Sequence, residues 1–366
     1  SLSLIGTFIV RSGLITSVHS FALDPARGIF ILGLLGFFIG GALLLYGLRA
    51  SALEPTGGFA AISKEGALVA NNLLLAAALG TVFIGTLYPL ALDLMAGKQI
   101  SVGPPYFNAT FIPLMTPLMA LMALGPLLAW KRGRLGEAAH KLRGPLAVAL
   151  MALLALAAFA NVRSALALLG FTLSFALLAG IAADLRARRR LRGLPADVWA
   201  MVLGHLGMAV ACFGITAIGT WQQEALTILK VGDSARIGAF AVRLDAVDPV
   251  AGPNYTALRA TMSATRDGRP VTVLHPEARV YDAPVMETTE AAIHPLWNGD
   301  LYAVIGEETA DGRWSVRLHW KPFVLWIWAG AVIMALGGAV AVLGRWREVW
   351  PGGVNVRAPA APAPAE

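Results

Sequence analysis

Long apolar runs dominate the pattern of hydrophobic and polar positions along the chain. A helix needs about 20 predominantly apolar residues to cross the hydrocarbon core of a bilayer. Seven stretches meet or approach that length, at residues 28–48, 68–92, 108–130, 145–161, 164–184, 197–220 and 322–344. Leu2–Val10 is too short to cross, and we expect it to be the end of a truncated helix with residues missing upstream. The pattern predicts about seven full transmembrane helices and a partial one.

A different period appears between residues 221 and 320. Phe240, Val242 and Leu244 alternate with small or polar residues, and residues 314–320 repeat this alternation. Such alternation is typical of half-buried strands. Shorter candidate strands lie at residues 226–231, 255–264, 270–275 and 301–306. We therefore expect an inserted antiparallel β-rich domain, built as a small sandwich or barrel.

Together the two patterns predict a mainly α-helical polytopic membrane protein with a β insertion. Its parts are the end of a truncated transmembrane helix (1–10), an outer loop (11–27), a bundle of six transmembrane helices (28–220), an outer β domain (221–320), the last transmembrane helix (321–344) and a cytoplasmic tail (345–366). The composition agrees, because 57% of the residues are hydrophobic and only 14% are charged. A soluble chain usually carries about 25% charged residues.

The net charge of +7 follows from membrane topology rather than from a nucleic-acid surface. Basic residues fall in every second loop between the spans and after the last span. They are Arg49, Lys64, Lys131, Arg132, Arg134, Lys141, Arg143, Arg186, Arg188, Arg189, Arg190, Arg192, Arg345 and Arg347. The positive-inside rule makes that side cytoplasmic. Residues 11–27 and 221–320 then lie outside, and we expect no nucleic-acid partner.

Other polar chemistry is sparse. The single cysteine, Cys212, lies within a span, which excludes thiol–disulfide exchange and thiolate zinc sites for this chain. His140 lies in a basic loop and is expected to be solvated. His275, His294 and His319 are scattered through the β segment without the spacing of metal ligands, so we expect surface or structural roles for them.

His205 differs because it is expected about 12 Å inside the membrane from the cytoplasmic end of its span. Ionisable residues at such depth are costly and usually functional. Gly204, Gly207, Ala209 and Ala211 surround it with little side-chain bulk, and that gap would suit a flat ligand such as a porphyrin, whose iron accepts a neutral imidazole. The alternative is a hydrogen bond between helices.

His19 lies in the loop at residues 11–27, which links two spans. This loop is amphipathic and is predicted to lie along the membrane surface. Its apolar positions are Leu14, Ile15, Val18 and Phe21. From the residues alone, His19 is as readily a solvated side chain as a ligand.

Short motifs are spread along the chain in an order that is specific to one family. They are Gly6-Thr-Phe-Ile-Val-Arg-Ser-Gly13, Thr16-Ser-Val-His19, Asp24-Pro-Ala-Arg-Gly28, Gly204-His-Leu-Gly207, Thr289-Glu-Ala-Ala-Ile293 with Leu301-Tyr302, Trp314-Ser-Val-Arg317, and Lys321-Pro-Phe-Val324 with Trp326-Ile-Trp328. Together they resemble the C-terminal portion of the CcmF/NrfE-type haem lyase family of cytochrome c maturation.

The resemblance implies a haem lyase acting as part of a membrane complex. Such a protein takes haem from the holo-CcmE haem chaperone and helps attach it to the CxxCH motif of apocytochrome c. CcmH/CcmI-type subunits that handle the apocytochrome are the further implied partners. The implied location is the bacterial inner membrane, with the β domain and the His19 loop on the periplasmic side.

The resemblance also implies site residues. His19 matches the second of two outward histidines that ligate the transferred haem, and His205 matches the second of two intramembrane histidines that hold a haem b. The first histidine of each pair and the family's WWD segment are absent from the 366 residues, so we expect the partner ligands to come from elsewhere. Arg11 or Arg27 is a candidate to pair with a haem propionate.

Two readings without haem chemistry remain alternatives. The chain could be a secondary transporter with His205 in a proton relay, or a structural assembly subunit whose outer domain binds partners. Against transport, the spans show no other buried acid or base and no inverted repeat.

Overall fold

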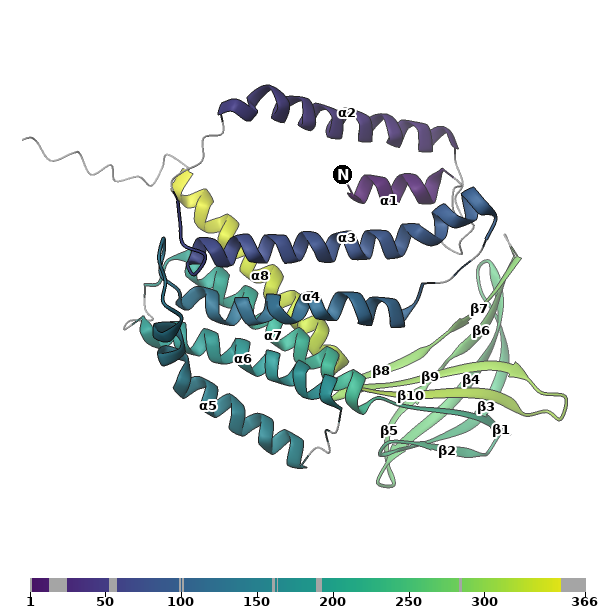
Figure 1. Cartoon of the computed structure of the whole chain (residues 1–366). Helices are drawn as coiled ribbons and strands as arrows, with labels where there is room; N and C mark the ends of the chain where they lie inside the picture. The colour runs from purple at the N-terminus through teal and green to yellow at the C-terminus, as the bar shows by residue number, and fades with distance from the viewer. Residues whose placement is uncertain are drawn as a thin grey trace, which may run out of the picture. The chain divides into compact units, whose positions relative to one another are not determined.

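The computed structural model describes residues 2–12, 25–52, 58–98, 100, 102–159, 162, 164–188, 193–282 and 285–349 (Figure 1). The chain divides into two compact units. The first comprises residues 1–121 and 128–135, and the second comprises residues 122–127 and 136–366. Each unit is best understood by itself.

The first unit is helical. Its elements are α1 (Leu2–Arg11), α2 (Pro25–Arg49), the 3-10 turn η1 (Ala50–Ala52), α3 (Lys64–Ala96) and most of α4 (Pro104–Leu124). The hydroxyl of Ser63 accepts a hydrogen bond from the Gly66 amide at 3.0 Å, which caps the start of α3. Gly97 ends that helix in the left-handed conformation, at φ 60°.

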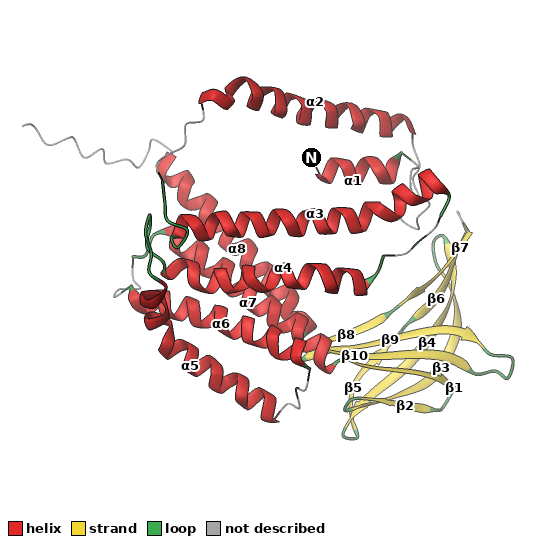
Figure 2. Ribbon diagram, in the orientation of Figure 1, coloured by secondary structure: helices red, strands yellow, loops and turns green. Residues whose placement is uncertain are grey.

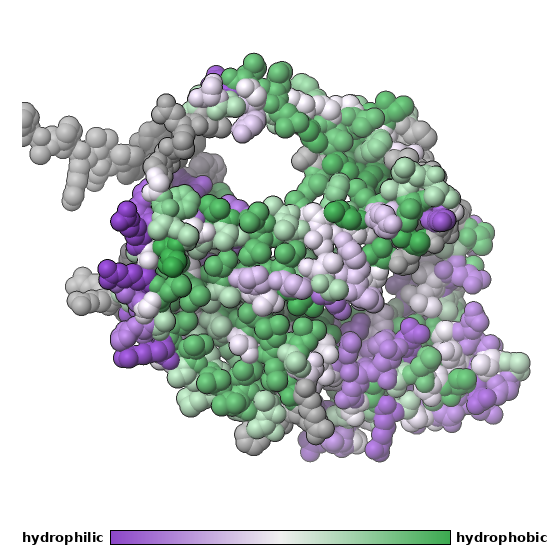
Figure 3. Space-filling view, viewed as in Figure 1, coloured by the Kyte–Doolittle hydropathy of each residue, from purple (hydrophilic) through white to green (hydrophobic). Residues whose placement is uncertain are grey.

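The second unit contains the remaining helices and every described strand. Its helices are η2 (Gly125–Leu127), α5 (Leu135–Phe159), α6 (Ala165–Ala187), α7 (Ala196–Trp221) and α8 (Val324–Val349). Counting both units, seven described helices are long and apolar enough to cross a bilayer, as the sequence predicted. These spans are Ala26–Ala52, Lys64–Asp93, Pro104–Leu127, Leu135–Ala158, Ala165–Ala187, Ala196–Trp221 and Val324–Trp346. Their outward surfaces are largely apolar, whereas the β strands carry more polar side chains (Figure 3).

Small residues bring α7 and α8 into close contact. A Cβ added to Gly330 of α8 would lie 2.5 Å from the carbonyl oxygen of Gly207 and 2.7 Å from the amide nitrogen of Ala211. A Cβ added to Gly214 would lie 3.1 Å from the carbonyl oxygen of Phe323. In lipid, helices associate mainly through packing and hydrogen bonds, so close approach at small residues is a principal source of their stability.

We expect Gly330→Ala to destabilise the packing of α7 against α8. The added methyl group overlaps backbone atoms of Gly207 and Ala211, which cannot rotate away. Overpacking of this kind typically costs about 1–3 kcal/mol. Thermal unfolding of the detergent-purified protein would measure the loss. Gly338→Ala is the matched control on the same helix, because nothing lies within 4 Å of its added Cβ; equal melting temperatures for both variants would contradict the expectation.

The β strands, which follow α7 and precede α8 in the chain, form two antiparallel sheets (Figure 2). The first sheet has the order β1-β10-β9-β8, and the second has the order β2-β3-β4-β6-β7 with β5 also paired to β4. The strands are β1 (Gln223–Leu229), β2 (Ser234–Ile237), β3 (Phe240–Ala251), β4 (Tyr255–Arg266), β5 (Arg269–Leu274), β6 (Glu277–Asp282), β7 (Val285–Glu290), β8 (Ala292–Leu296), β9 (Gly299–Glu308) and β10 (Trp314–Pro322).

The core of this β sandwich comes from alternate residues of both sheets. On β9 and β10 the buried positions include Leu301, Ile305, Val316 and Leu318, each fully buried. They pack against a layer from the second sheet that includes Phe240, Val242, Leu244, Ala260 and Met262. The inward side chains thus follow the period of two that the sequence showed. The expected β-rich domain is confirmed as a sandwich.

Candidate functional site

His205 lies inside α7, and its imidazole is half-buried. Its Nδ1 atom lies 2.8 Å from the carbonyl oxygen of Met201, one helical turn earlier. The hydrogen bond is therefore made within the helix, to the backbone. The alternative expectation, a hydrogen bond from His205 to a neighbouring helix, is not met among the residues that the structure describes.

This contact fixes which ring nitrogen of neutral His205 carries the proton. A carbonyl oxygen only accepts, so Nδ1 must donate. Nε2 then keeps its lone pair, and within the described part of the chain nothing hydrogen-bonds to it. An imidazole whose Nδ1–H is held by a backbone carbonyl is well suited to bind iron through Nε2. The geometry fits an axial haem ligand.

The helix face that carries His205 looks toward α6. Successive steps of four, three and four residues from His205 lead to Ala209, Cys212 and Thr216. These spacings place all four residues on one face of the helix. The hydroxyl of Ser174 on α6 donates a 2.8 Å hydrogen bond to the carbonyl oxygen of Ala209. Helix α6 therefore covers this face one turn beyond the imidazole.

The small residues around His205 do not form the expected gap. Gly207 and Ala211 lie on the opposite face of α7, where they contact Gly330 of α8, and Ala209 is fully buried. The prediction treated all small neighbours as space for a porphyrin and was wrong for these residues, because tight helix packing uses them. Gly204 alone has nothing within 4 Å of its added Cβ.

One buried acid in the spans was missed. Asp184, near the end of α6, is 5% exposed, and its carboxylate accepts from Arg188 Nε at 2.7 Å. The expectation that the spans hold no buried acid or base other than His205 was therefore wrong. Arg188 comes one turn later and reaches back to Asp184, so the carboxylate has a counter-charge at the helix end.

Ser12 and Gly28, which follow Arg11 and Arg27 in the chain, lie close together in the structure. Arg11 is the last residue of α1, and Arg27 lies in the first turn of α2. A Cβ on Gly28 would lie 3.2 Å from the Cα of Ser12, so the two helix ends meet within the first unit. His19 lies outside the described residues, and its role stays a prediction.

The remaining histidines show no metal site. Among the described residues, no group of three or more His, Cys, Asp or Glu side chains could hold a metal ion. The ring of His319 packs edge-on against Tyr302, with ring centroids 5.2 Å apart. Burial lowers the pKa of His319 below its ordinary value. The ring contact is compatible with the surface or structural role expected for His319, which stays a prediction.

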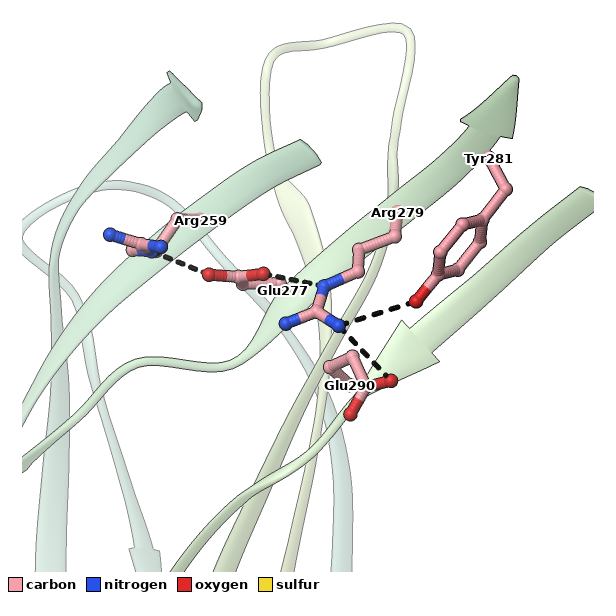
Figure 4. A network of polar contacts seen from close by, with 5 residues as sticks. All are labelled: Arg259, Glu277, Arg279, Tyr281 and Glu290. Carbon is pink, nitrogen blue, oxygen red and sulfur yellow. Dashed lines mark hydrogen bonds and ion pairs between the residues drawn. The ribbon is translucent and has the colours of Figure 1, made fainter. Parts of the chain in front are cut away.

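A charged network in the β sandwich was not predicted. The carboxylate of Glu277 on β6 accepts from Arg259 Nε at 2.6 Å and from Arg279 Nε at 2.7 Å (Figure 4). Arg279 also contacts Glu290 of β7 at 3.3 Å and the hydroxyl of Tyr281 at 3.4 Å. Three strands are thereby tied together. Two charged residues spaced two apart on one strand are not a recognisable sequence motif. The network could be predicted only if the pairing of β4 with β6 were already known.

Glu277 is ionised in the folded protein. Its side chain is only 6% exposed. Burial alone would raise the pKa of Glu277, but the hydrogen bonds and charges of Arg279 and Arg259 outweigh it and hold the pKa below its ordinary value. The network is therefore a structural brace whose charges compensate one another.

Comparison with known proteins connects this architecture to a family. A family model described as "CcmF C-terminal beta-sandwich" matches residues 220–322. The chain is 43% identical over 357 residues to "Cytochrome c-type biogenesis protein CycK" of Rhizobium meliloti, covering 94% of the chain and 53% of that protein. It is 42% identical over 356 residues to "Cytochrome c-type biogenesis protein CcmF" of Escherichia coli, covering 95% and 54%.

A solved structure shares the fold. "Cytochrome c Heme Lyase CcmF" matches with a TM-score of 0.66 at 24% identity, covering 91% of this chain and 53% of that one. The chain thus spans about half the length of the curated relatives that it matches. The sandwich, the spans and the sequence identity together show that the chain belongs to the CcmF/NrfE-type family of cytochrome c-type biogenesis proteins, over its C-terminal portion.

Proposed function

We propose that this chain is the haem-ligating part of a haem lyase that matures c-type cytochromes. It would take haem from the chaperone CcmE and help attach it to the CxxCH motif of apocytochrome c, together with CcmH/CcmI-type subunits. The observation that carries the proposal is the prepared Nε2 lone pair of His205, within a span of a chain 42% identical to a CcmF protein.

His205 would hold a haem b within the membrane. The Met201 carbonyl keeps Nδ1 protonated, which fixes the ring and makes Nε2 the better donor. When bound, such a haem supplies one-electron redox chemistry, whose potential the axial ligand helps to set.

His19 would ligate the haem that is being transferred. The step itself adds a cysteine thiol across a haem vinyl group. The S–H bond and the π bond of the vinyl group break, one C–S bond and one C–H bond form, and no oxidant is consumed. The axial imidazole orients the haem while the thiols approach; it does not act as an acid or a base. Ligation positions the reacting groups, and the haem provides the reactivity.

The charge pattern supports an orientation for the chain. Basic residues gather in alternate loops, so those loops are assigned to the cytoplasm of a bacterial inner membrane. The β sandwich lies between α7 and α8 at the other ends of these helices. It is therefore assigned to the periplasm, where apocytochrome c and CcmE would meet it.

Covalent haem attachment in cells tests the proposal. We expect that disrupting the gene for this chain removes the haem-stained band of a c-type reporter cytochrome on a denaturing gel, and that restoring the gene returns it. A b-type cytochrome, which holds haem without covalent bonds, serves as the control and should be unchanged. Loss of both cytochromes would favour the transporter reading, and an unchanged c-type band would refute the proposal.

Arg11 and Arg27 are proposed to pair with propionates of the transferred haem. Their helix ends meet at Ser12 and Gly28, which flank the segment that carries His19. Removing both guanidinium groups should weaken haem binding about tenfold, because a hydrogen bond to a charged group contributes about 1.5 kcal/mol. Haem titration of the full-length protein would measure this. Arg132→Ala is the control in another loop, and equal haem affinity in all variants would remove the role.

A further inference from the structure

One end of the β sandwich is opened by a cleft of about 850 Å³. It lies at the end of β9 and the start of β10, opposite the strand ends that join α7 and α8. Leu258, Val280 and Trp314 give it apolar walls. Glu287, Glu307 and Glu308 also line it and are exposed. The cleft is thus an apolar groove with an acidic rim.

A change of sheet between β7 and β8 creates the groove. Only Ala291 separates these two strands, yet β8 pairs with β9 in one sheet and β7 pairs with β6 in the other. Strand β8 covers β9 only from Gly299 to Ala303. Strands β7 and β9 therefore diverge beyond that point, and both line the cleft with residues 287–289 and 306–308.

Among the described residues, this fork leaves two strand edges without a partner. Strand β7 is the last strand in its sheet, and β9 has no described neighbour on the β8 side from Val304 to Glu308. A free edge presents unpaired N–H and C=O groups that can pair with an added strand. The free stretches are five residues on β9 and six on β7. They match a short extended segment of similar length.

The charges of the groove select its occupant. Within the described residues, Glu287, Glu307 and Glu308 have no ion-pair partner, whereas Arg279 in the groove wall is paired with Glu277 and Glu290 (Figure 4). Residues 223–322 contain 13 acidic and 10 basic residues, while the whole chain is basic. The groove therefore holds an acidic excess that an ammonium or guanidinium side chain would complement.

We propose that the groove between β7 and β9 binds a short, extended, basic polypeptide segment of a partner protein by strand addition. Alternate side chains of the segment would point to the apolar wall, and its Lys or Arg side chains would lie against the glutamate rim. The proposal goes beyond the haem lyase function and does not depend on it. A metal ion is not the occupant, since no described carboxylate cluster could hold one.

Peptide binding to the full-length protein in detergent tests this. The probe is a fluorescent peptide, Thr-Lys-Val-Lys-Val-Lys-Thr, followed by anisotropy. We expect saturable binding that weakens at least tenfold in the double variant Glu287→Lys with Glu308→Lys. Glu224→Lys is the matched control, because Glu224 is an exposed carboxylate on β1, away from the cleft. Hydrogen exchange of the core strands would show that each variant remains folded.

Two further probes separate strand addition from simple charge attraction. The same peptide with N-methyl groups at alternate residues cannot donate ladder hydrogen bonds, so its affinity should fall at least tenfold. The peptide with Glu in place of Lys should not bind the wild-type protein but should bind the double variant. Absence of binding at 1 mM probe, equal binding of the N-methylated peptide, or equal binding by the double variant would each overturn the proposal.

Discussion

Replacing His205 with alanine is expected to remove nearly all of the intramembrane haem from the full-length protein. The change deletes the only described ring nitrogen in the spans with a prepared lone pair, while it leaves the helix backbone intact. Alanine is a good helix former, so α7 should still form. The absorption spectrum of the detergent-purified protein measures the result as loss of the Soret band of a ligated b-type haem.

The matched control is His140→Ala. His140 was expected in a loop but lies near the start of α5, where it is exposed and outside the proposed site. Its Soret band should equal that of the wild type. Added imidazole should restore part of the band to His205→Ala, because the free ligand can occupy the space that the side chain left. A full Soret band in His205→Ala without imidazole would show that another group ligates the iron, and the proposal for His205 would fall.

Replacing Glu277 with alanine is expected to cause a large loss of stability in the β sandwich. The carboxylate is nearly inaccessible to solvent and neutralises two arginines, so its removal leaves Arg279 without its closest counter-charge. Breaking a buried ion pair costs about 3–5 kcal/mol. Arg259 is 42% exposed and can turn to water, so we expect about 2–4 kcal/mol. Hydrogen exchange of the β4 and β6 amides reports the change.

The surface pair of Glu224 and Arg317 supplies the control. Both side chains are more than half exposed, so Glu224→Ala should change stability by less than about 0.5 kcal/mol. Equal loss of protection in the two variants would contradict a special role for Glu277. The lowered pKa of Glu277 also predicts how the stability of the sandwich depends on pH. Its stabilisation is fully present above the ordinary value of 4.5 and is lost as the pH falls toward the folded pKa, but only in proteins that retain Glu277.

The sequence was sufficient for the helices because lipid imposes a simple rule on length and polarity. Each of the seven predicted spans has a corresponding helix. Strands with clean alternation, such as β3 and β10, were also predicted. Four strands were missed: β2, β6, β7 and β8. Strand β6 reads Glu-Ala-Arg-Val-Tyr-Asp. Its Glu277 and Arg279 pair within the sheet rather than facing water, so they do not read as the exposed positions of a strand.

The candidate site was predictable in part. The depth of His205 follows from its place in an apolar run, and the structure places it inside α7. The packing of the small residues around His205 could not be predicted from the sequence. Gly207 and Ala209 look alike in sequence, but one faces α8 and the other lies beside Ser174 of α6. Only the packing partners show which small residue leaves room beside His205 and which is in contact with a neighbouring helix.

The junctions of the sandwich with the membrane have a mechanical consequence. Helix α7 runs into β1 through Gln222, and β10 runs into α8 through Phe323. Strands β1 and β10 are hydrogen-bonded neighbours, with Gln223 opposite Trp320. Two contacts thus hold the helices together: the β1–β10 ladder and the packing of Gly207 against Gly330. Neither helix can slide along its axis without breaking one of these contacts. They form one stiff stalk, so His205 keeps a fixed height relative to the sandwich even when the stalk moves in the lipid.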